Sequence, residues 1–332
     1  MCIGVPTAFS NYKFKQNVTP QSKKALKTII ETCLAVKRDE HLAIVIHEKQ
    51  HAIGGALWNI ARRFTRNLTI IYFSNVKKDD CQMNHGICDL LRNVDVGIII
   101  TPGVLQVDQL GSAQQTGTRI VVIQNSSENL IERALDSNFY RVSMKSRKVA
   151  DLFSIGKSLH VMSPTGTDLK VDINNLLATA ETGLANKPGE LASIPAGEAN
   201  LIIKNATGKI AIDRIAGNKK KLSQPILMFV NQGKITQIKG SVEADLLKKQ
   251  LRKFGTDARK LYEFGLGTNK SVVLGRSGEE DEKANGAVHI SFGQNLTKPE
   301  NGKIVPSIKG IIMKATLSLD GNIIAQNGEF LF

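Results

Sequence analysis

The sequence predicts two domains: a doubly wound α/β domain over residues 1–160 and a mainly β (α+β) domain over residues 161–332. Three observations predict this organisation. The chain has 332 residues, and domains average roughly 150 residues. The first half alternates apolar runs with helical patterns, which is typical of a parallel sheet covered on both faces. From about residue 160 the strands become short and are joined by Gly, Asn and Asp, which favours hairpins.

The first half contains strands that alternate with helices. The run at 41–48 (HLAIVIHE) is rich in Ile and Val, and residues 51–64 follow it with helical spacing of their apolar positions. Further strands are expected at 68–74, 94–101 and 119–125, and further helices near 83–92 and at 128–135. No GxGxxG or GxxxxGK[ST] motif is present, so nucleotide binding is not predicted for this domain.

The second half is expected to be built from hairpins. Gly-containing turns interrupt the apolar runs at 226–238 and 315–328, with further strands at 168–173, 200–205 and 209–215. One long helix is expected from Ser241 to about Tyr262, because its apolar residues form one stripe. The basic residues elsewhere on this helix are interpreted as a solvated face: Lys248, Lys249, Arg252 and Lys253.

The composition excludes several classes of protein. The net charge is +14, but aromatic residues make up only 5% and none is interleaved with a basic motif, so no nucleic-acid partner is expected. No apolar run approaches the ~20 residues of a membrane helix, and the N-terminal residues lack a secretory pattern. The four cysteines, Cys2, Cys33, Cys81 and Cys88, are too few for a disulfide scaffold. A cytoplasmic protein without membrane association is therefore expected.

Two groups of potential metal ligands lie in the first half. Residues 47–51 (HEKQH) fit the HExxH pattern literally, but that motif works on a continuous helix, and His47 closes a predicted strand. Cys81, His85 and Cys88 could share one face of a helix, although a fourth ligand is not evident. Neither group is interpreted as a metal site.

The second half offers a better set of candidates. Glu198 directly precedes a predicted strand, Glu263 lies at the expected end of the long helix, and His289 lies inside a strand after an acidic cluster. Two carboxylates and an imidazole at the edges of elements could converge on a divalent metal. The alternative, with both glutamates as solvated loop residues, stays open.

Five motifs in order resemble one family. They are SPTGTDLKVDI (163–173), PAGE (195–198), EFGLGTN (263–269), DEKANGAVHISFG (281–293) and GIIMKATLSLDGNIIAQNG (310–328). Together they resemble the thermophilic-type metallo-aminopeptidases, the aminopeptidase T/S family, to which dihydroxypyridine ring-opening dioxygenases are distantly related. The resemblance implies an aminopeptidase-T-like fold with a cleft, and a homodimer.

The resemblance also implies roles for particular residues. In that family five side chains hold two divalent metals, and a tyrosine assists catalysis. Glu198, Glu263 and His289 match three of the metal ligands.

Three positions depart from the family pattern. Ser307 and Lys309 stand at the family's HxD pair, which the ring-opening relatives also use to hold iron, and Leu296 stands at its tyrosine. An ammonium within a few Å of a dication is strongly unfavourable in a desolvated cleft. Lys309 is therefore expected to pair with Glu198 or Glu263, and the reduced site to hold one divalent metal (zinc, manganese or iron) or none. Glu198, Glu263 and Lys309 are the expected catalytic residues.

Three functional interpretations remain. The first is a divergent aminopeptidase-like hydrolase that acts on a small amino-acid-like or peptide-like substrate with a one-metal or metal-free site. The second is a catalytically inactive protein that keeps the cleft for binding. The third is a metal-dependent aminopeptidase whose missing ligands come from Glu279, Glu280 or Asp281.

Overall fold

The computed structural model describes residues 18–74, 84–102, 107–124, 128–218, 220–293 and 307–332. The chain forms two compact units: unit 1 comprises Met1–Asp136 and Leu184–Ile194, and unit 2 comprises Ser137–Gly183 and Pro195–Phe332. This division differs from the expected boundary at residue 160. In the described part of the chain, no helix is long and apolar enough to cross a membrane.

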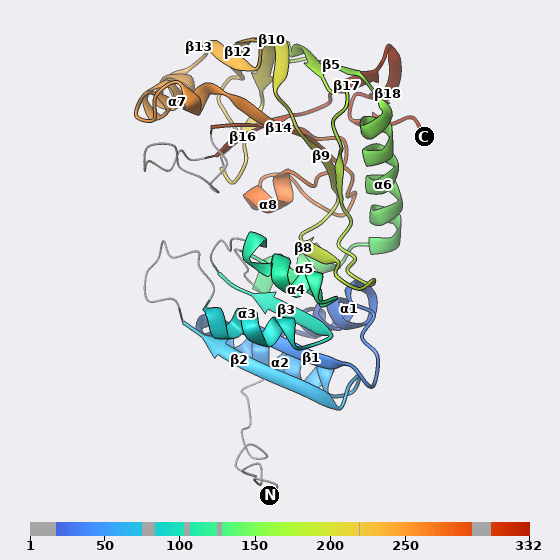
Figure 1. The fold of residues 1–332 in the computed structure, drawn as a ribbon. Helices are drawn as coiled ribbons and strands as arrows, with labels where there is room; N and C mark the ends of the chain where they lie inside the picture. Colours follow the sequence, from blue (N-terminus) through green and yellow to red (C-terminus); the bar gives the residue numbers. More distant parts are fainter. Residues whose placement is uncertain (1–17, 75–83, 103–106, 125–127, 219, 294–306) are drawn as a thin grey trace, which may run out of the picture. The chain divides into compact units, whose positions relative to one another are not determined.

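Unit 1 is an α/β structure around a five-stranded parallel sheet (Figure 1). In spatial order the strands are β2 (Asn67–Phe73), β1 (His41–His47), β3 (Val96–Ile100), β4 (Arg119–Ile123) and β8 (Leu191–Ile194). The four strands expected in the first half are thus confirmed. The last strand, β8, comes from the second half of the sequence, which is why the division is not a single cut.

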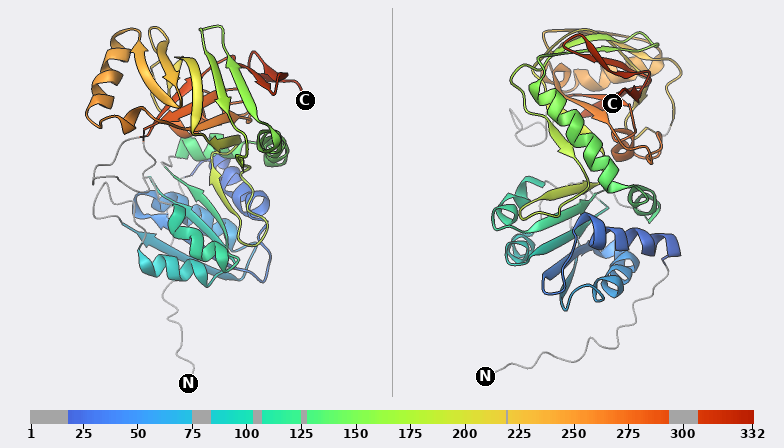
Figure 2. Two further views of the ribbon diagram at one scale, coloured as in Figure 1. Left: turned by 45° about the horizontal axis from the view of Figure 1, so that its top comes forward. Right: turned by 90° about the vertical axis from the view of Figure 1, so that its right-hand side faces the viewer.

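Helices cover both faces of this sheet, as two views of the ribbon show (Figure 2). On one face lie α3 (His85–Arg92) and α4 (Gly111–Gln115); on the other lie α1 (Pro20–Thr28), α2 (His51–Ala61) and α5 (Glu128–Leu135). Strands β3 and β4 are buried along their whole length, as expected for Ile- and Val-rich strands between two helical layers. Side-chain caps set the starts of two helices: Thr19 accepts from the Ser22 N–H in α1, and Asn84 accepts from the Gly86 N–H in α3.

Unit 2 contains two antiparallel sheets. The eight-stranded sheet has the order β13 (Lys234–Lys239), β12 (Ile226–Asn231), β10 (Asn205–Ile212), β6 (Asp168–Asp172), β5 (Ser158–Met162), β17 (Thr316–Leu319), β18 (Asn322–Gln326) and β19 (Glu329–Phe330). The six-stranded sheet has the order β11 (Arg214–Ile215), β16 (Ile308–Ile312), β15 (Val288–Phe292), β14 (Leu261–Gly267), β9 (Glu198–Ile202) and β7 (Thr179–Glu181). The mainly antiparallel second half is confirmed.

One hydrophobic core joins these sheets to two helices, α6 (Phe139–Ile155) and α7 (Val242–Arg252). Within it the rings of Phe153 and Phe264 lie 5.9 Å apart. Since α6 packs against β7 and β9, it belongs to unit 2 although it precedes residue 160.

The prediction of one long helix from Ser241 to Tyr262 is wrong for its second half. Helix α7 ends at Arg252, and Gly255 then adopts φ +77°, a conformation that breaks a helix. A short 3-10 turn, Asp257–Arg259, leads directly into β14. Glu263 therefore lies inside a strand rather than at a helix end.

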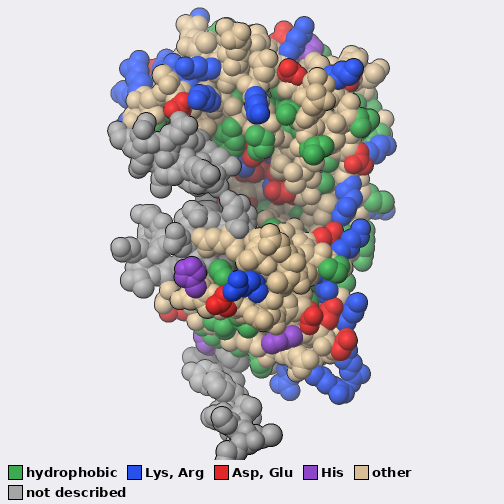
Figure 3. Space-filling view, in the orientation of Figure 1, with side chains coloured by type: hydrophobic (Ala, Val, Ile, Leu, Met, Phe, Trp, Pro, Cys, Tyr) green, Lys and Arg blue, Asp and Glu red, His purple; other side chains and the backbone are tan. Residues whose placement is uncertain are grey.

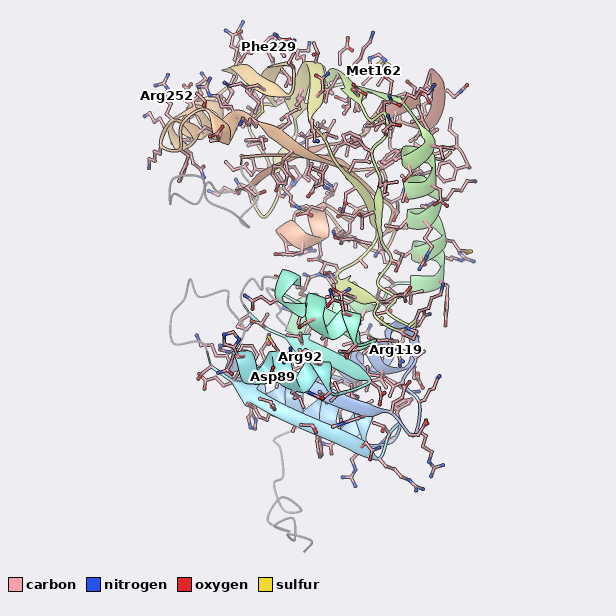
Figure 4. All side chains as sticks on the ribbon, in the orientation of Figure 1. Asp89, Arg92, Arg119, Met162, Phe229 and Arg252 are labelled. Carbon is pink, nitrogen blue, oxygen red and sulfur yellow. The ribbon has the colours of Figure 1, made fainter. Side chains whose placement is uncertain are left out.

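The outer surface of α7 is basic. Lysine and arginine side chains gather at the upper left of Figure 3, where Figure 1 places α7 and β13. Arg252 and Phe229, both labelled in Figure 4, mark this side of the unit. The sequence places Val242 and Leu246 in the apolar stripe of this helix. They are 72% and 59% exposed, so that part of the prediction is wrong.

Candidate metal centre

One face of the six-stranded sheet carries a row of polar side chains. Side chains alternate between the two faces of a strand. In β15 the first, third and fifth residues belong to the hydrophobic core, so the second and fourth, His289 and Ser291, point to the opposite face. The registers add partners from neighbouring strands, which are Lys309 opposite Ser291, Glu263 opposite Ser291, Gly265 opposite His289, and Glu181 opposite Glu198.

A β-bulge shapes this row in β14. Leu261 pairs with Phe292 and Glu263 pairs with Ser291, so Tyr262 is the extra residue. The Tyr262 hydroxyl forms a hydrogen bond with the Ser307 hydroxyl. Burial raises the pKa of Tyr262.

Gly265 makes room for the imidazole of His289. A Cβ at Gly265 would lie 2.1 Å from Cε1 and 2.4 Å from Nε2 of the His289 ring. Any side chain at position 265 would therefore displace the ring, so this glycine is a requirement of the site rather than of a turn.

Gly267 lets a second segment approach the sheet. A Cβ at Gly267 would lie 2.1 Å from the Ala284 carbonyl oxygen. The segment that follows α8 (Gly278–Asp281) is fastened there by hydrogen bonds, including one from the Gly267 N–H to the Ala287 carbonyl oxygen at 2.9 Å. This segment carries Glu282 and Lys283 to the polar row.

His289 lies between two carboxylates and is fully buried. Its Nε2 lies 3.0 Å from Glu263 Oε1 in a hydrogen bond. Burial alone raises the pKa of Glu263, but this bond and the charge of Lys309 outweigh it and hold that pKa below its usual value. An ionised carboxylate only accepts hydrogen bonds, so Nε2 carries the proton.

The other ring nitrogen of His289 faces Glu198. Its Nδ1 lies 3.5 Å from Glu198 Oε2, and both atoms are buried without a hydrogen-bond partner among the described residues. Burial lowers the pKa of His289, but the charge of Glu198 and the bond with Glu263 outweigh it and raise that pKa. Two buried polar atoms that face one another without a hydrogen bond indicate a missing partner.

Two ammonium groups lie among the carboxylates. Lys283 Nζ lies 2.6 Å from Glu181 Oε2, 2.8 Å from Glu198 Oε1 and 3.8 Å from Glu282 Oε2. Lys309 Nζ lies 2.7 Å from Glu282 Oε2 and 3.3 Å from Glu263 Oε1. Burial lowers the pKa of either lysine, but the carboxylates outweigh it and raise both pKa values, so both groups are charged.

The donor set fits one divalent cation. Glu198, Glu282 and His289 each offer an atom within 4.8 Å of the others. Two donors bound to one cation in tetrahedral geometry at about 2.1 Å lie roughly 3.4 Å apart, close to the 3.5 Å between Nδ1 and Oε2. With the four carboxylates ionised, both lysines charged and His289 neutral, as a metal ligand must be, the cluster would carry two net negative charges, which a divalent cation would balance.

The other candidates from the sequence lie elsewhere or have other partners. Glu280 accepts a hydrogen bond from Ser277, and Asp281 accepts from the backbone N–H groups of Gly217 and Gly275, so both act in local structure. Leu296 and Cys81 lie outside the described residues. His47 ends β1 and His51 begins α2; the first packs edge-on against Phe73 and the second stacks on Tyr72.

Sequence reasoning missed three members of this cluster, which are Glu181, Glu282 and Lys283. The acidic run before His289 pointed to the correct segment, but position alone does not tell which of its carboxylates faces the sheet. Glu181 lies in β7, a strand of three residues. So short a strand shows no alternation of apolar and polar residues, so its pairing with β9 could not be predicted from the sequence.

The chain matches the model of one protein family over residues 36–331, and that family is described as 2,5-dihydroxypyridine 5,6-dioxygenase. The chain belongs to this family. Its fold is similar to that of 2,5-dihydroxypyridine dioxygenase from Pseudomonas putida KT2440, with a TM-score of 0.79 and 17% identity over 93% of this chain and 96% of that chain. It is also similar to AmpT from Thermus thermophilus, with a TM-score of 0.64 and 15% identity over 94% and 99% of the two chains.

The motifs predicted a relation to the aminopeptidases and to the dihydroxypyridine dioxygenases, and the comparisons support both relations. The motifs were interpreted as those of the aminopeptidases, with the dioxygenases as distant relatives. The family to which the chain belongs is instead that of the dioxygenases. No curated protein matches the sequence. At these identities the structural likeness establishes the mixed α/β fold of the dihydroxypyridine dioxygenase family, and no particular activity.

Proposed function

We propose that the chain is a metal-dependent enzyme of the dihydroxypyridine dioxygenase family, in which Glu198, Glu282 and His289 hold one divalent cation next to a small-molecule substrate. One observation carries the proposal: Nδ1 of His289 faces Glu198 without a hydrogen bond, while Nε2 is bonded to Glu263. Ligating histidines typically donate their other ring N–H to a carboxylate in this way. Glu263 is then an orienting group rather than the ligand expected from the sequence.

The residues of the chain have separate roles in this site. Bound iron(II) would supply reactivity toward oxygen, whereas zinc or manganese would act as a Lewis acid. Glu263 fixes the proton on Nε2 of His289, which leaves Nδ1 unprotonated and free to bind a cation through its lone pair. Lys283 keeps Glu198 in place, and it is nearly buried, with 7% of its side chain exposed. The side chain of Lys309 is 25% exposed, and its ammonium, next to Glu263 and Glu282, is the cation that we assign to an anionic oxygen of the substrate.

The family favours oxidative opening of a small hydroxylated aromatic ring as the reaction. Such substrates carry acidic hydroxyl groups, and an ammonium favours their ionised form. Lys309 is the residue proposed for that task.

One observation favours a second candidate, hydrolysis of a small amino-acid-like or peptide-like substrate. Oxygen-activating iron sites typically use two histidines and one carboxylate. The cluster in the described residues offers one imidazole and two carboxylates. A ligand set rich in carboxylate also suits zinc and manganese, which serve in hydrolysis.

Metal binding tests the proposal first. Calorimetric titration of metal-stripped protein with Mn²⁺, Zn²⁺ and, without oxygen, Fe²⁺ should show one binding site per chain. Glu198→Gln and His289→Ala should weaken binding by about 100-fold or more, because each removes a ligand. The matched control is Asp151→Asn, which changes an exposed carboxylate of the same unit. No binding to the unaltered chain would refute the proposal.

Activity then separates the candidates. Oxygen uptake with 2,5-dihydroxypyridine and related dihydroxylated rings, in the iron-loaded protein, is expected for the first. Hydrolysis of aminoacyl anilides by the zinc- or manganese-loaded protein would support the second. Metal and substrate binding without turnover would leave the binding-protein interpretation.

A further inference from the structure

Unit 1 has a groove lined by residues of α1 and α2 and of the segments that follow them. These two helices pack side by side (Figure 2). The groove has a volume of about 560 Å³, which is within the range of small-molecule pockets. Its lining residues are Lys23, Lys24, Lys27, Glu31, Ala56, Asn59, Ile60, Arg63 and Phe64. None of them belongs to the metal centre, which lies in unit 2.

The rim of the groove is strongly cationic. Four basic side chains line it against one carboxylate, that of Glu31. Lys24 is 3.5 Å from Asp136 and Lys27 is 3.1 Å from Glu31, both in exposed pairs. Lys23 and Arg63 form no ion pair with any residue that the structure describes. Two positive charges therefore remain after the two pairs are counted.

The end of α1 does not account for this charge. The carboxylate of Glu132, from α5, accepts hydrogen bonds from the hydroxyls of Thr19 and Ser22. The positive end of the helix dipole is thus already satisfied. Lys23 and Lys24, in the N-terminal half of α1, gain no stabilisation from this dipole, so the helix itself does not explain them.

The floor of the groove is apolar. Ala56, Ile60 and Phe64 are spaced by four residues, so they lie along one side of α2 and its continuation. Ile60 and Phe64 are only half-buried. A water-exposed apolar strip between cations suits a ligand with an apolar body and an anionic group.

We propose that this groove binds a small organic phosphate, with an apolar or aromatic body on the floor and a phosphate monoester between Lys23 and Arg63. A phosphate monoester carries close to two negative charges at neutral pH, which matches the two unpaired cations. Both lysine and arginine bind phosphate, and arginine does so with two parallel hydrogen bonds. Inorganic phosphate lacks the body and a nucleoside lacks the charge, so each serves as a partial probe.

Calorimetric titration with AMP, adenosine and inorganic phosphate tests the proposal. EDTA is present throughout, so that phosphate cannot bind a metal in unit 2. AMP should bind best, with an affinity that falls as salt is added. The double variant Lys23→Ala/Arg63→Ala should lose about tenfold or more in AMP affinity. Arg66→Ala, which removes an exposed cation outside the groove, should leave it unchanged.

Each outcome decides one way. Weaker AMP binding in the double variant, at an unchanged melting temperature, supports the groove as the site. Equal AMP binding in the double variant, or no AMP binding to the unaltered chain, overturns the proposal. Inorganic phosphate or adenosine binding as tightly as AMP would overturn the ligand class, because one half of the groove would then contribute nothing.

Discussion

Two strands of equal length and equal burial differ in what they bury. Val96–Ile100 (β3) and Val288–Phe292 (β15) each have five residues, all buried. The first contributes only apolar side chains and glycine to a parallel sheet between helices. The second contributes apolar side chains to the core on one face and His289 and Ser291 to the polar row on the other.

The difference between the two strands indicates that the reactive groups of this fold lie on the polar face of the six-stranded sheet. A buried polar group costs free energy unless it has partners. No such cost arises in β3, whereas His289 needs a partner on both ring nitrogens. Glu263 supplies one, and the proposed cation supplies the other.

The largest effect is expected from a methyl group on the sheet of unit 2. Gly265→Ala places a Cβ 2.1 Å from the His289 ring, which Glu263 holds in place. We expect a loss of about 4 kcal/mol in the free energy of unfolding. Gly97→Ala in β3 meets only the end of the Leu91 side chain, at 2.7 Å. That side chain can move, so the expected loss is about 1.5 kcal/mol.

Urea unfolding of the two alanine variants measures this contrast, and metal titration of each sharpens it. Gly97→Ala should keep its metal affinity. Equal losses of stability in both variants would show that the imidazole is not held more rigidly than an ordinary leucine.

The next effect concerns a largely buried ion pair of unit 1, between Arg119 and Glu40, whose side chains are 8% and 11% exposed. Arg119, labelled in Figure 4, donates to both carboxylate oxygens of Glu40, at 2.9 and 2.7 Å. Burial raises the pKa of Glu40, but the bonds from Arg119 and the Lys37 N–H outweigh it and lower that pKa. Removing one partner of a buried pair is costly, so Glu40→Gln should lose about 3 kcal/mol of stability at pH 7.

This loss should depend on pH in a definite direction. The folded-state pKa of Glu40 lies below the unfolded value of about 4.3. The stabilisation is therefore present above that value and lost as pH falls through the folded-state pKa. Chemical unfolding of both proteins between pH 7 and pH 3 should show the gap closing at the acid end. A gap that stays constant would mean that the pair does not carry the difference.

A smaller effect is expected from exchanging the lysine of the metal centre. Ser307→His with Lys309→Asp removes the ammonium that bridges Glu263 and Glu282 and adds two potential ligands. We expect at least a tenfold gain in Zn²⁺ or Mn²⁺ affinity, about 1.4 kcal/mol. Calorimetry of the parent and the double variant measures it. Unchanged binding by a folded variant would show that Lys309 does not oppose a cation.

Hydrolysis of simple amino-acid anilides is expected to be barely above background with zinc, cobalt or manganese. Ser307 and Lys309 stand where the resemblance to aminopeptidases implies metal ligands, and losing a ligand typically costs orders of magnitude in rate. Release of the aniline product, followed by absorbance, measures this. Robust turnover would favour a peptidase with substituted ligands.

The sequence predicts four of the five strands of the parallel sheet, because runs such as RIVVI are apolar throughout and are stable only when both faces are buried. It does not predict β8 (Leu191–Ile194), which joins the sheet from the second half of the chain. It also singled out Glu198, Glu263 and His289, which the structure brings within 3.0 and 3.5 Å of one another through the imidazole. The roles of these residues remain predictions. The end of α7 at Arg252 was not predicted, since the apolar pattern continues past Gly255, whose positive φ stops the helix from resuming. Glu282 could not be chosen from its acidic neighbours, because only the close approach allowed by Gly267 decides which carboxylate reaches the sheet.

The most direct test is the number of divalent cations bound per chain and their position. Crystals of the chain soaked in Mn²⁺, measured with anomalous scattering, would show both. We predict a single peak between Nδ1 of His289 and the carboxylates of Glu198 and Glu282, with Lys309 outside its coordination sphere. A site without any peak, or two peaks with Glu263 as a bridging ligand, would contradict the one-metal centre.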